Sequence, residues 1–157
     1  MKIVLEDDFH CFACGKLNTR GLQIDWKVEG NRTFAEFTPA KIYQGWKGWV
    51  HGGIIATLLD EAMTRTAWLV AGGALTAEMT VRYIKTAAID EKIFILGQTL
   101  EENKRIVRTQ SFLFKKNAVE NSPPEKKFQD YALLELLRTP QWTLLARAEG
   151  KALKTRS

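Results

Sequence analysis

The sequence predicts an α+β protein in which a mainly antiparallel sheet of five or six strands wraps around one long central helix. Three observations support this prediction. Residues 52–71 place apolar side chains at helical spacing over about five turns. Stretches with strand patterns neighbour one another in the sequence on both sides of that helix. Helix and strand patterns do not alternate regularly, so a doubly wound parallel sheet is excluded.

Two strands are predicted before the helix. Between residues 22 and 28, apolar and polar side chains alternate with the period of two that is typical of a half-buried strand. A Glu-Gly-Asn turn follows, and residues 33–38 form the return strand of a hairpin, which Pro39 stops. Residues 40–50, with two glycines and two tryptophans, form an irregular approach to the helix.

The central helix has two distinct faces. Its main apolar stripe contains Ile55, Leu58, Leu59, Ala62, Thr66 and Leu69. On a wheel of about 100° per residue, Asp60 points roughly 140° away from Ile55. It shares that direction with small residues that let another surface come close: Ala56, Thr57, Thr64 and Ala67. Glu61 lies on the opposite flank, where solvent exposure or an ion pair with Arg65 explains its charge.

Four further strands are predicted after the helix. Residues 75–83 alternate between apolar and polar side chains, and residues 92–101 are more uniformly apolar. Residues 105–116 follow after a turn. This spacing suits an antiparallel meander. Residues 142–154 form the last strand.

An insertion, residues 117–141, separates the last two of these strands. Residues 122–125 read Ser-Pro-Pro-Glu, a capping box with proline at the first helical position. We therefore expect a short helix that ends near Arg138. One side of it shows Phe128, Tyr131, Leu134 and Leu137.

Length and composition indicate a single domain over residues 1–157. Hydrophobic residues make up 45% and charged residues 26%, close to soluble globular averages, and no apolar stretch approaches the roughly 20 residues that span a bilayer. The first residues lack the apolar region and cleavage site of a secretory signal. We therefore expect a cytoplasmic protein without a membrane partner.

The formal net charge of +5 permits attraction to nucleic acid, an acidic membrane or a phosphate-bearing small molecule. Lysine and arginine are spread along the chain without a basic tail or a nucleic-acid-reading motif. This distribution argues against a nucleic-acid partner and leaves a polyanionic small ligand open.

The two cysteines, Cys11 and Cys14, form a CxxC motif. A tetrahedral structural zinc needs four ligands, and His10 is poorly placed to help because it is adjacent to Cys11. Pairs from two chains, or a redox role, stay open, although the surrounding sequence does not open a βαβ unit. The simplest interpretation is two small, half-buried thiols beside a glycine turn, with no metal and no cofactor.

The start of the central helix has the chemistry of an oxyanion site. The first N–H groups of a helix lack intrahelical acceptors and carry partial positive charge. Gly52 and Gly53 remove side chains that would keep a substrate carbonyl from the Gly52 amide, and His51 can add a hydrogen bond or set the turn. Two helical turns on, Asp60 offers a carboxylate that can activate water or attack a carbonyl.

Each of these residues also has an ordinary structural interpretation, since histidine and glycines often cap helices and a single aspartate is usually solvated. The place of Asp60 on a small-residue face of a very apolar helix favours a functional role, because an idle charge there is costly. One helix alone cannot form a closed active site, and a second chain can supply the missing wall of that site. If two sheets join edge to edge, Asp60 of one chain meets the helix N-terminus of the other.

Three stretches carry a family resemblance: "CFACGKLNTRGL", "GWVHGGIIATLLDEAM" and "TAEMTVRYIKTA". They resemble the hotdog-fold acyl-CoA thioesterases, specifically the PaaI-like branch, over roughly residues 10–115. The resemblance implies a sheet wrapped around a central helix, a homodimer or dimer of dimers, and hydrolysis of an acyl-CoA without metal or organic cofactor.

The resemblance also implies roles for individual residues. Asp60 would be the general base or nucleophile, the Gly52 amide would polarise the thioester carbonyl, and His51 would support that site. Thr76 stands where the family has a Ser or Thr that orients the attacking water or the carboxylate. Several relatives have Asn at the position of Gly45, where it makes a second contact to the carbonyl or the water, and here the neighbouring Gln44 is a candidate substitute. Gly53 would also contact the substrate.

The phosphates of coenzyme A would need basic residues near the mouth of the site. Arg82 and Lys85 are the first candidates, followed by Lys104 and Arg105; the alternative is that these residues only solubilise strand ends. Trp46, Trp49 and Trp68 would line an acyl pocket or serve as core or interface residues.

Other functions remain open from the sequence. A non-catalytic acyl-CoA-binding protein of the same fold would not need Asp60, and a hotdog dehydratase would need a histidine and an acid across the substrate. A zinc or nucleic-acid protein built around CxxC rests on the weakest motif. The insertion would cap the acyl pocket, extend an oligomer contact or cover the sheet edge.

Overall fold

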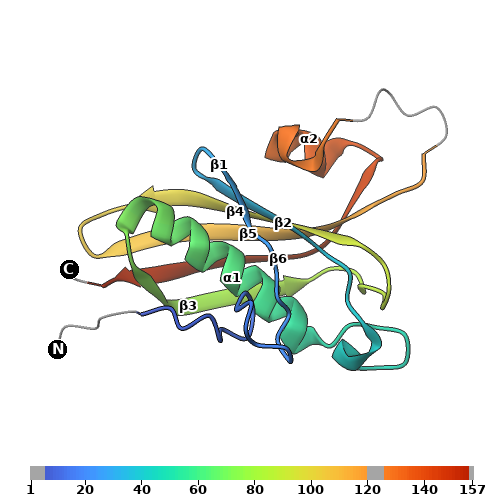
Figure 1. The fold of residues 1–157 in the computed structure, drawn as a ribbon. Helices are drawn as coiled ribbons and strands as arrows, with labels where there is room; N and C mark the ends of the chain where they lie inside the picture. Colours follow the sequence, from blue (N-terminus) through green and yellow to red (C-terminus); the bar gives the residue numbers. More distant parts are fainter. Residues whose placement is uncertain (1–5, 120–125, 156–157) are drawn as a thin grey trace.

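The computed structural model describes residues 6–119 and 126–155. The chain forms one six-stranded antiparallel sheet with strand order β1-β2-β4-β5-β6-β3, and helix α1 lies across one face of it (Figure 1). The predicted fold class is therefore confirmed. The elements in chain order are β1 (Lys27–Glu29), β2 (Arg32–Phe37), α1 (Gly52–Ala71), β3 (Ala74–Tyr83), β4 (Ile93–Glu102), β5 (Ile106–Lys116), α2 (Leu133–Arg138) and β6 (Trp142–Lys154).

Helix α1 begins and ends where its apolar spacing predicts. It ends because Gly72 adopts a left-handed conformation with φ of 68°, which favours glycine. Its buried side chains pack on the apolar face of the central strands. Leu69, predicted in this stripe, is instead 42% exposed, while Ala67 is fully buried. The last turns of α1 pack against Ala74 of β3 and Ala152 of β6, and these small side chains allow the helix to lie close to the sheet.

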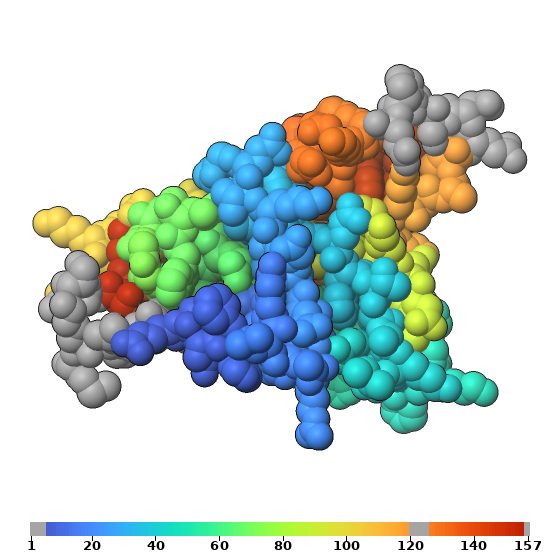
Figure 2. Space-filling view, viewed as in Figure 1, coloured from blue at the N-terminus to red at the C-terminus, as the bar shows by residue number. Residues whose placement is uncertain are grey.

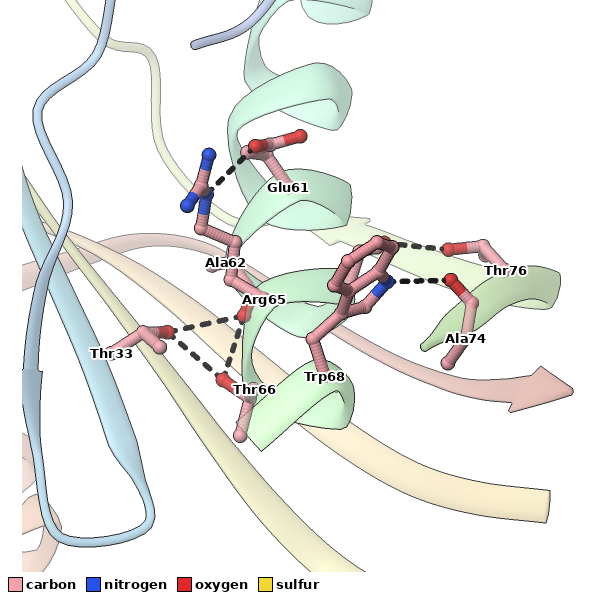
Figure 3. A network of polar contacts seen from close by, with 9 residues as sticks. Thr33, Glu61, Ala62, Arg65, Thr66, Trp68, Ala74 and Thr76 are labelled. Carbon is pink, nitrogen blue, oxygen red and sulfur yellow. Dashed lines mark hydrogen bonds and ion pairs between the residues drawn. The ribbon is translucent and has the colours of Figure 1, made fainter. Parts of the chain in front are cut away.

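Gly97 on β4 lies directly beneath the middle of α1. A Cβ atom at this position would collide with the Ala62 carbonyl oxygen and with the hydroxyls of Thr33 and Thr66. Both hydroxyls donate to the Ala62 carbonyl, at 3.1 Å and 2.7 Å, and their oxygens lie 2.9 Å apart (Figure 3). This buried polar contact fixes α1 against the sheet at a distance that only glycine allows.

Replacing Gly97 by alanine is expected to lower the free energy of unfolding by about 3 kcal/mol, because the added methyl group must displace backbone and break these hydrogen bonds. Urea unfolding followed by circular dichroism measures the change. The control is Gly30→Ala, where the space is open and φ is 59°, so that only backbone strain of about 1 kcal/mol is expected. Equal losses for the two variants would contradict this account of α1 packing.

The first predicted strand is mostly irregular. Leu22 and Ile24 are buried as their alternation predicts, but their N–H groups donate to the carbonyls of Phe12 and Ala13, at 2.8 Å and 3.0 Å. The residue between them, Gln23, has a φ of 50°. The alternation therefore predicts correctly which side chains are buried, but most of the segment does not pair as a strand. Only residues 27–29 pair in the sheet. The segment before them runs beside α1 (Figure 1).

The insertion packs on the sheet face opposite α1. The capping box at residues 122–125 lies outside the described residues. Helix α2 begins at Leu133, where the Glu135 carboxylate accepts the Ala132 N–H at 2.7 Å. The predicted apolar side is only partly right. Phe128 and Tyr131 pack in an aromatic cluster as predicted. A 3-10 turn at Phe128–Asp130 precedes α2, which buries Leu136 in that cluster while Leu134 and Leu137 are exposed.

Among the described residues, no helix combines the length and the apolar character that crossing a membrane requires.

Candidate active site

His51 caps the N-terminus of α1. Its backbone is extended, with φ of −62° and ψ of 135°, and its Nδ1 accepts the Gly53 N–H at 2.9 Å. In the neutral ring the proton therefore sits on Nε2. A Cβ on Gly53 would lie only 3.0 Å from His51 Nδ1. Gly53, expected to contact substrate, is thus explained by this cap, which occupies its amide.

The Gly52 amide is the free donor at this helix end. Its N–H has no hydrogen-bond acceptor within the described part of the chain. The Gly52 carbonyl accepts the Tyr83 hydroxyl at 3.0 Å, which ties the first turn of α1 to the end of β3. A free amide at the positive end of a 20-residue helix is suited to stabilise an oxyanion.

The loop before α1 holds His51 in place. A Cβ on Gly45 would lie 3.1 Å from the Cα of His51, so the chain passes close behind the cap. The Gln44 side-chain oxygen accepts the Gly48 N–H at 2.8 Å. Gln44, expected as a substrate contact, therefore uses this oxygen to order the loop.

Asp60 belongs to a hydrogen-bonded series of three polar side chains. Thr76 Oγ1 donates to Asp60 Oδ1 at 2.7 Å, and Thr64 Oγ1 lies 2.9 Å from Thr76 Oγ1. Because Thr76 has one hydroxyl proton, Thr64 is the donor to Thr76. Asp60 Oδ2 accepts no hydrogen bond from the described residues, so it is available to a water molecule. The structure thus brings Asp60 and Thr76 together as the family resemblance implies.

The Gly52 amide and Asp60 do not form one reaction centre within a single chain. Eight residues of α-helix rise about 12 Å, whereas a reacting carbonyl must lie about 3 Å from both its oxyanion donor and its nucleophile. Both groups nevertheless contact the same strand, since β3 supplies Thr76 beside Asp60 and Tyr83 beside Gly52. That strand forms one edge of the sheet.

Arg82 lies on the sheet face away from α1. It stands opposite Arg147 of β6 and lines a hollow of about 430 Å³ with Arg108, while the neighbouring Val81 packs against the core under α1. A register shift between Thr76 and Glu78 changes the phase of β3, so Thr76 and Arg82 face opposite sides.

The other expected basic residues also lie apart from Asp60 in one chain. Lys85 lines a separate hollow of about 450 Å³ with Trp49. Arg105 lies in the β4–β5 turn, where its N–H donates to Asn103 Oδ1 at 2.9 Å. Three tryptophans that were expected to line a pocket, the core or an interface are exposed: Trp46 at 87%, Trp49 at 44% and Trp68 at 41%. Trp68 Nε1 donates to the Ala74 carbonyl at 2.8 Å (Figure 3).

A second polar cluster forms where the N-terminal segment meets α1. One ligating atom each of Cys11, Cys14 and Glu61 lies within 4.8 Å of the others. Glu61 also accepts from Arg65 Nε at 3.0 Å, which confirms the predicted ion pair (Figure 3). Burial, followed by the hydrogen bond and the charge of Glu61, raises the pKa of the Cys14 thiol from 9.0 to about 12. Sequence alone did not connect Glu61 with the thiols, because some 50 residues separate them.

The two thiols are expected to differ in reactivity. Alkylation needs the thiolate, and a raised pKa lowers the thiolate fraction at any pH below about 12. At pH 8, iodoacetamide should therefore modify the exposed Cys11 more than about tenfold faster than Cys14. Peptide mass spectrometry of the reduced, metal-free protein measures both rates, with the urea-unfolded chain as the control. Equal rates in the folded protein would contradict the described environment of Cys14.

Comparison with known proteins matches the chain to one superfamily. The thioesterase superfamily matches residues 47–120. Human acyl-coenzyme A thioesterase THEM5 is 30% identical over 57 residues, which cover 36% of this chain and 23% of the human protein. The chain thus matches about a quarter of that relative's length.

Solved structures share the fold. The E. coli PaaI protein from the phenylacetic acid degradation operon has a TM-score of 0.67 at 13% identity, covering 87% of this chain and 82% of its own. The Streptococcus mutans UA159 protein smu.793, solved bound to acetyl CoA, has a TM-score of 0.59 at 16% identity, covering 85% and 91%. These likenesses establish the fold, and the matched residues 47–120 contain the whole of α1 and β3.

Proposed function

We propose that this chain belongs to the hotdog-fold thioesterase superfamily, whose model matches residues 47–120, and that it hydrolyses an acyl-CoA thioester to a free carboxylic acid and coenzyme A. The observation that supports the proposal most is that α1 carries both a Gly52 amide without an acceptor among the described residues and an Asp60 carboxylate that Thr76 orients. The first can stabilise an oxyanion, and the second can activate water or attack the carbonyl itself.

In the general-base form of the reaction, Asp60 takes a proton from water as the water oxygen attacks the thioester carbon. The carbonyl oxygen becomes an oxyanion that accepts a hydrogen bond from the Gly52 amide. Collapse of this intermediate breaks the carbon–sulfur bond, and the coenzyme A thiolate takes the proton from Asp60. In the nucleophilic form, Asp60 attacks the carbon directly, and the carbon–sulfur bond breaks as the coenzyme A thiolate leaves. Water then hydrolyses the resulting anhydride to the carboxylic acid and the Asp60 carboxylate, and the proton that is released goes to the thiolate. Thr76 fixes one carboxylate oxygen in either form.

A homodimer completes the site, because the two groups are about 12 Å apart along one helix. Strand β3 has 10 residues and no proline, and its outer edge pairs with no other strand in the described part of the chain, so it is suited to pair with a second copy. In an antiparallel pair with a two-fold axis at Thr80, the register shift between Thr76 and Glu78 lets Thr76 of one chain lie opposite Tyr83 of the other, with both side chains on the α1 face. The carboxylate of one copy then approaches the α1 N-terminus of the other, giving two equivalent sites.

The same interface would decide how coenzyme A is held. Arg82, Lys85 and Arg105 lie away from Asp60 within one chain, so they reach the phosphates only if the second copy brings them there. The reaction as proposed uses no metal and no organic cofactor. The cytoplasmic location, the PaaI-like branch and the pairing of dimers into a tetramer stay predictions from the sequence.

The two rival functions differ from hydrolysis in testable ways. A dehydratase needs a histidine nitrogen that can accept a proton, yet in the neutral His51 ring Nδ1 accepts the Gly53 N–H and Nε2 already carries the proton. A thiol-release assay with short, medium, branched and aromatic acyl-CoAs tests the proposal. Release of coenzyme A from at least one class is expected. Binding of acyl-CoA without release from any class would favour the non-catalytic binding protein and contradict the proposal.

A further inference from the structure

We propose that Cys11, Cys14 and Glu61 form a binding site for a thiophilic divalent cation, with Zn²⁺ the best chemical match. The three ligating atoms come from two segments that are distant in sequence and lie within 4.8 Å of one another. Two thiolates with one carboxylate are a donor set that suits Zn²⁺ better than the oxygen-preferring cations. The site is separate from the proposed reaction centre and does not depend on hydrolysis.

The backbone around the cysteines holds both thiols on one side. The Gly15 N–H donates to the Cys11 carbonyl at 2.9 Å, which closes a helical turn that brings positions 11 and 14 together. A Cβ on Gly15 would collide with the backbone of Phe9 and Cys11. The hydrogen bonds of Leu22 and Ile24 then fix this turn beside α1. In a tetrahedral zinc site the ligand atoms lie about 3.5 to 3.8 Å apart, so side-chain adjustments of about 1 Å close the site.

Arg65 leaves one oxygen of Glu61 able to coordinate and makes the loaded site neutral. Arg65 Nε bonds one oxygen of Glu61 at 3.0 Å, and a carboxylate has a second oxygen that can coordinate. Two thiolates, the carboxylate, a divalent cation and the guanidinium together carry no net charge. Cysteine binds a metal as the thiolate, so each thiol gives up its proton on binding. Binding would therefore exchange protons for the metal.

The surroundings leave room for a fourth ligand. The three residues line a pocket of about 570 Å³ between the N-terminal segment and the second half of α1. Figure 2 shows the two parts side by side on the surface, the N-terminal segment in dark blue and the end of α1 in green. A water molecule can complete tetrahedral coordination from this pocket. The metal would tie residues 11–14 to the turn of α1 that carries Asp60.

Cobalt titration of the reduced full-length protein tests the site. We expect one Co²⁺ per chain with thiolate-to-cobalt charge-transfer absorption, displaced by Zn²⁺. Cys11→Ser and Cys14→Ser should each weaken that absorption and the affinity. Glu61→Gln retains both thiols and should lower affinity more than about tenfold. His10→Gln is the matched control next to the motif, because His10 Nδ1 bonds the Asp8 carbonyl outside the cluster.

Three results would overturn the proposal. The first is a lack of stoichiometric cobalt uptake by the reduced protein. This includes protein that is purified with a Cys11–Cys14 disulfide and takes up no cobalt after the disulfide has been reduced. The second is one metal per two chains, which would indicate four thiolates from a pair of copies. The third is unchanged affinity in Glu61→Gln. The spectra are read without substrate, so the result is independent of whether the protein hydrolyses thioesters.

Discussion

Replacing Asp60 by asparagine should lower kcat for acyl-CoA hydrolysis by about 10³-fold. The amide can neither take a proton from water nor attack the thioester carbon. Asparagine has the same shape, and its Oδ1 can still accept the Thr76 hydroxyl, so the fold should be unchanged. Single-turnover and steady-state thiol release measure the loss, with substrate binding expected to stay near that of the original protein.

Asp130→Asn is the matched control, because Asp130 is an exposed carboxylate in the insertion on the other face of the sheet. It should leave kcat within a factor of about two, as a surface change far from the site does. Hydrolysis that survives Asp60→Asn at the original rate would refute the role proposed for this carboxylate.

Replacing Gly52 by proline should lower kcat by about 10²-fold through loss of one N–H group. Proline is tolerated at the first helical position because that amide has no intrahelical acceptor. The preceding residue, His51, already has the extended ψ of 135° that proline requires. A Cβ at position 52 would meet the Tyr83 ring at 3.6 Å, which is ordinary contact.

Gly52→Ala distinguishes the effect of losing the N–H group from the effect of adding a side chain. It adds a Cβ and keeps the N–H, so it should retain most of the activity that Gly52→Pro loses. Circular dichroism and thermal unfolding verify that both variants stay folded. Similar kcat values for the two variants would contradict an oxyanion role for the Gly52 amide.

The long regular elements were predictable because their signals are strong and local. Helix α1 has apolar spacing through 20 residues and a glycine in the left-handed conformation at its end, and β6 has its predicted bounds. The first strand was not predictable from alternation. Leu22 and Ile24 are buried, yet their hydrogen bonds go to the N-terminal segment rather than to a strand.

The candidate site was predictable where residues are close in sequence or fixed by the family resemblance. Asp60 and Thr76 meet as expected, and His51 caps α1. The side on which Arg82 lies was not predictable, because the register shift after Thr76 reverses the alternation of β3. The approach of Glu61 to the cysteines depends on how the N-terminal segment crosses α1, which no local pattern encodes.

We propose that each reaction centre combines Asp60 of one copy with the Gly52 amide of another. Mixing the two impaired variants tests this claim. Asp60→Asn and Gly52→Pro chains, unfolded and refolded together in equal amounts, should regain about a quarter of the original activity, because half of the dimers are mixed and each mixed dimer holds one intact site. Each variant refolded alone should show only its own residual activity. A mixture no more active than its separate components would place both groups in the same chain and contradict the claim.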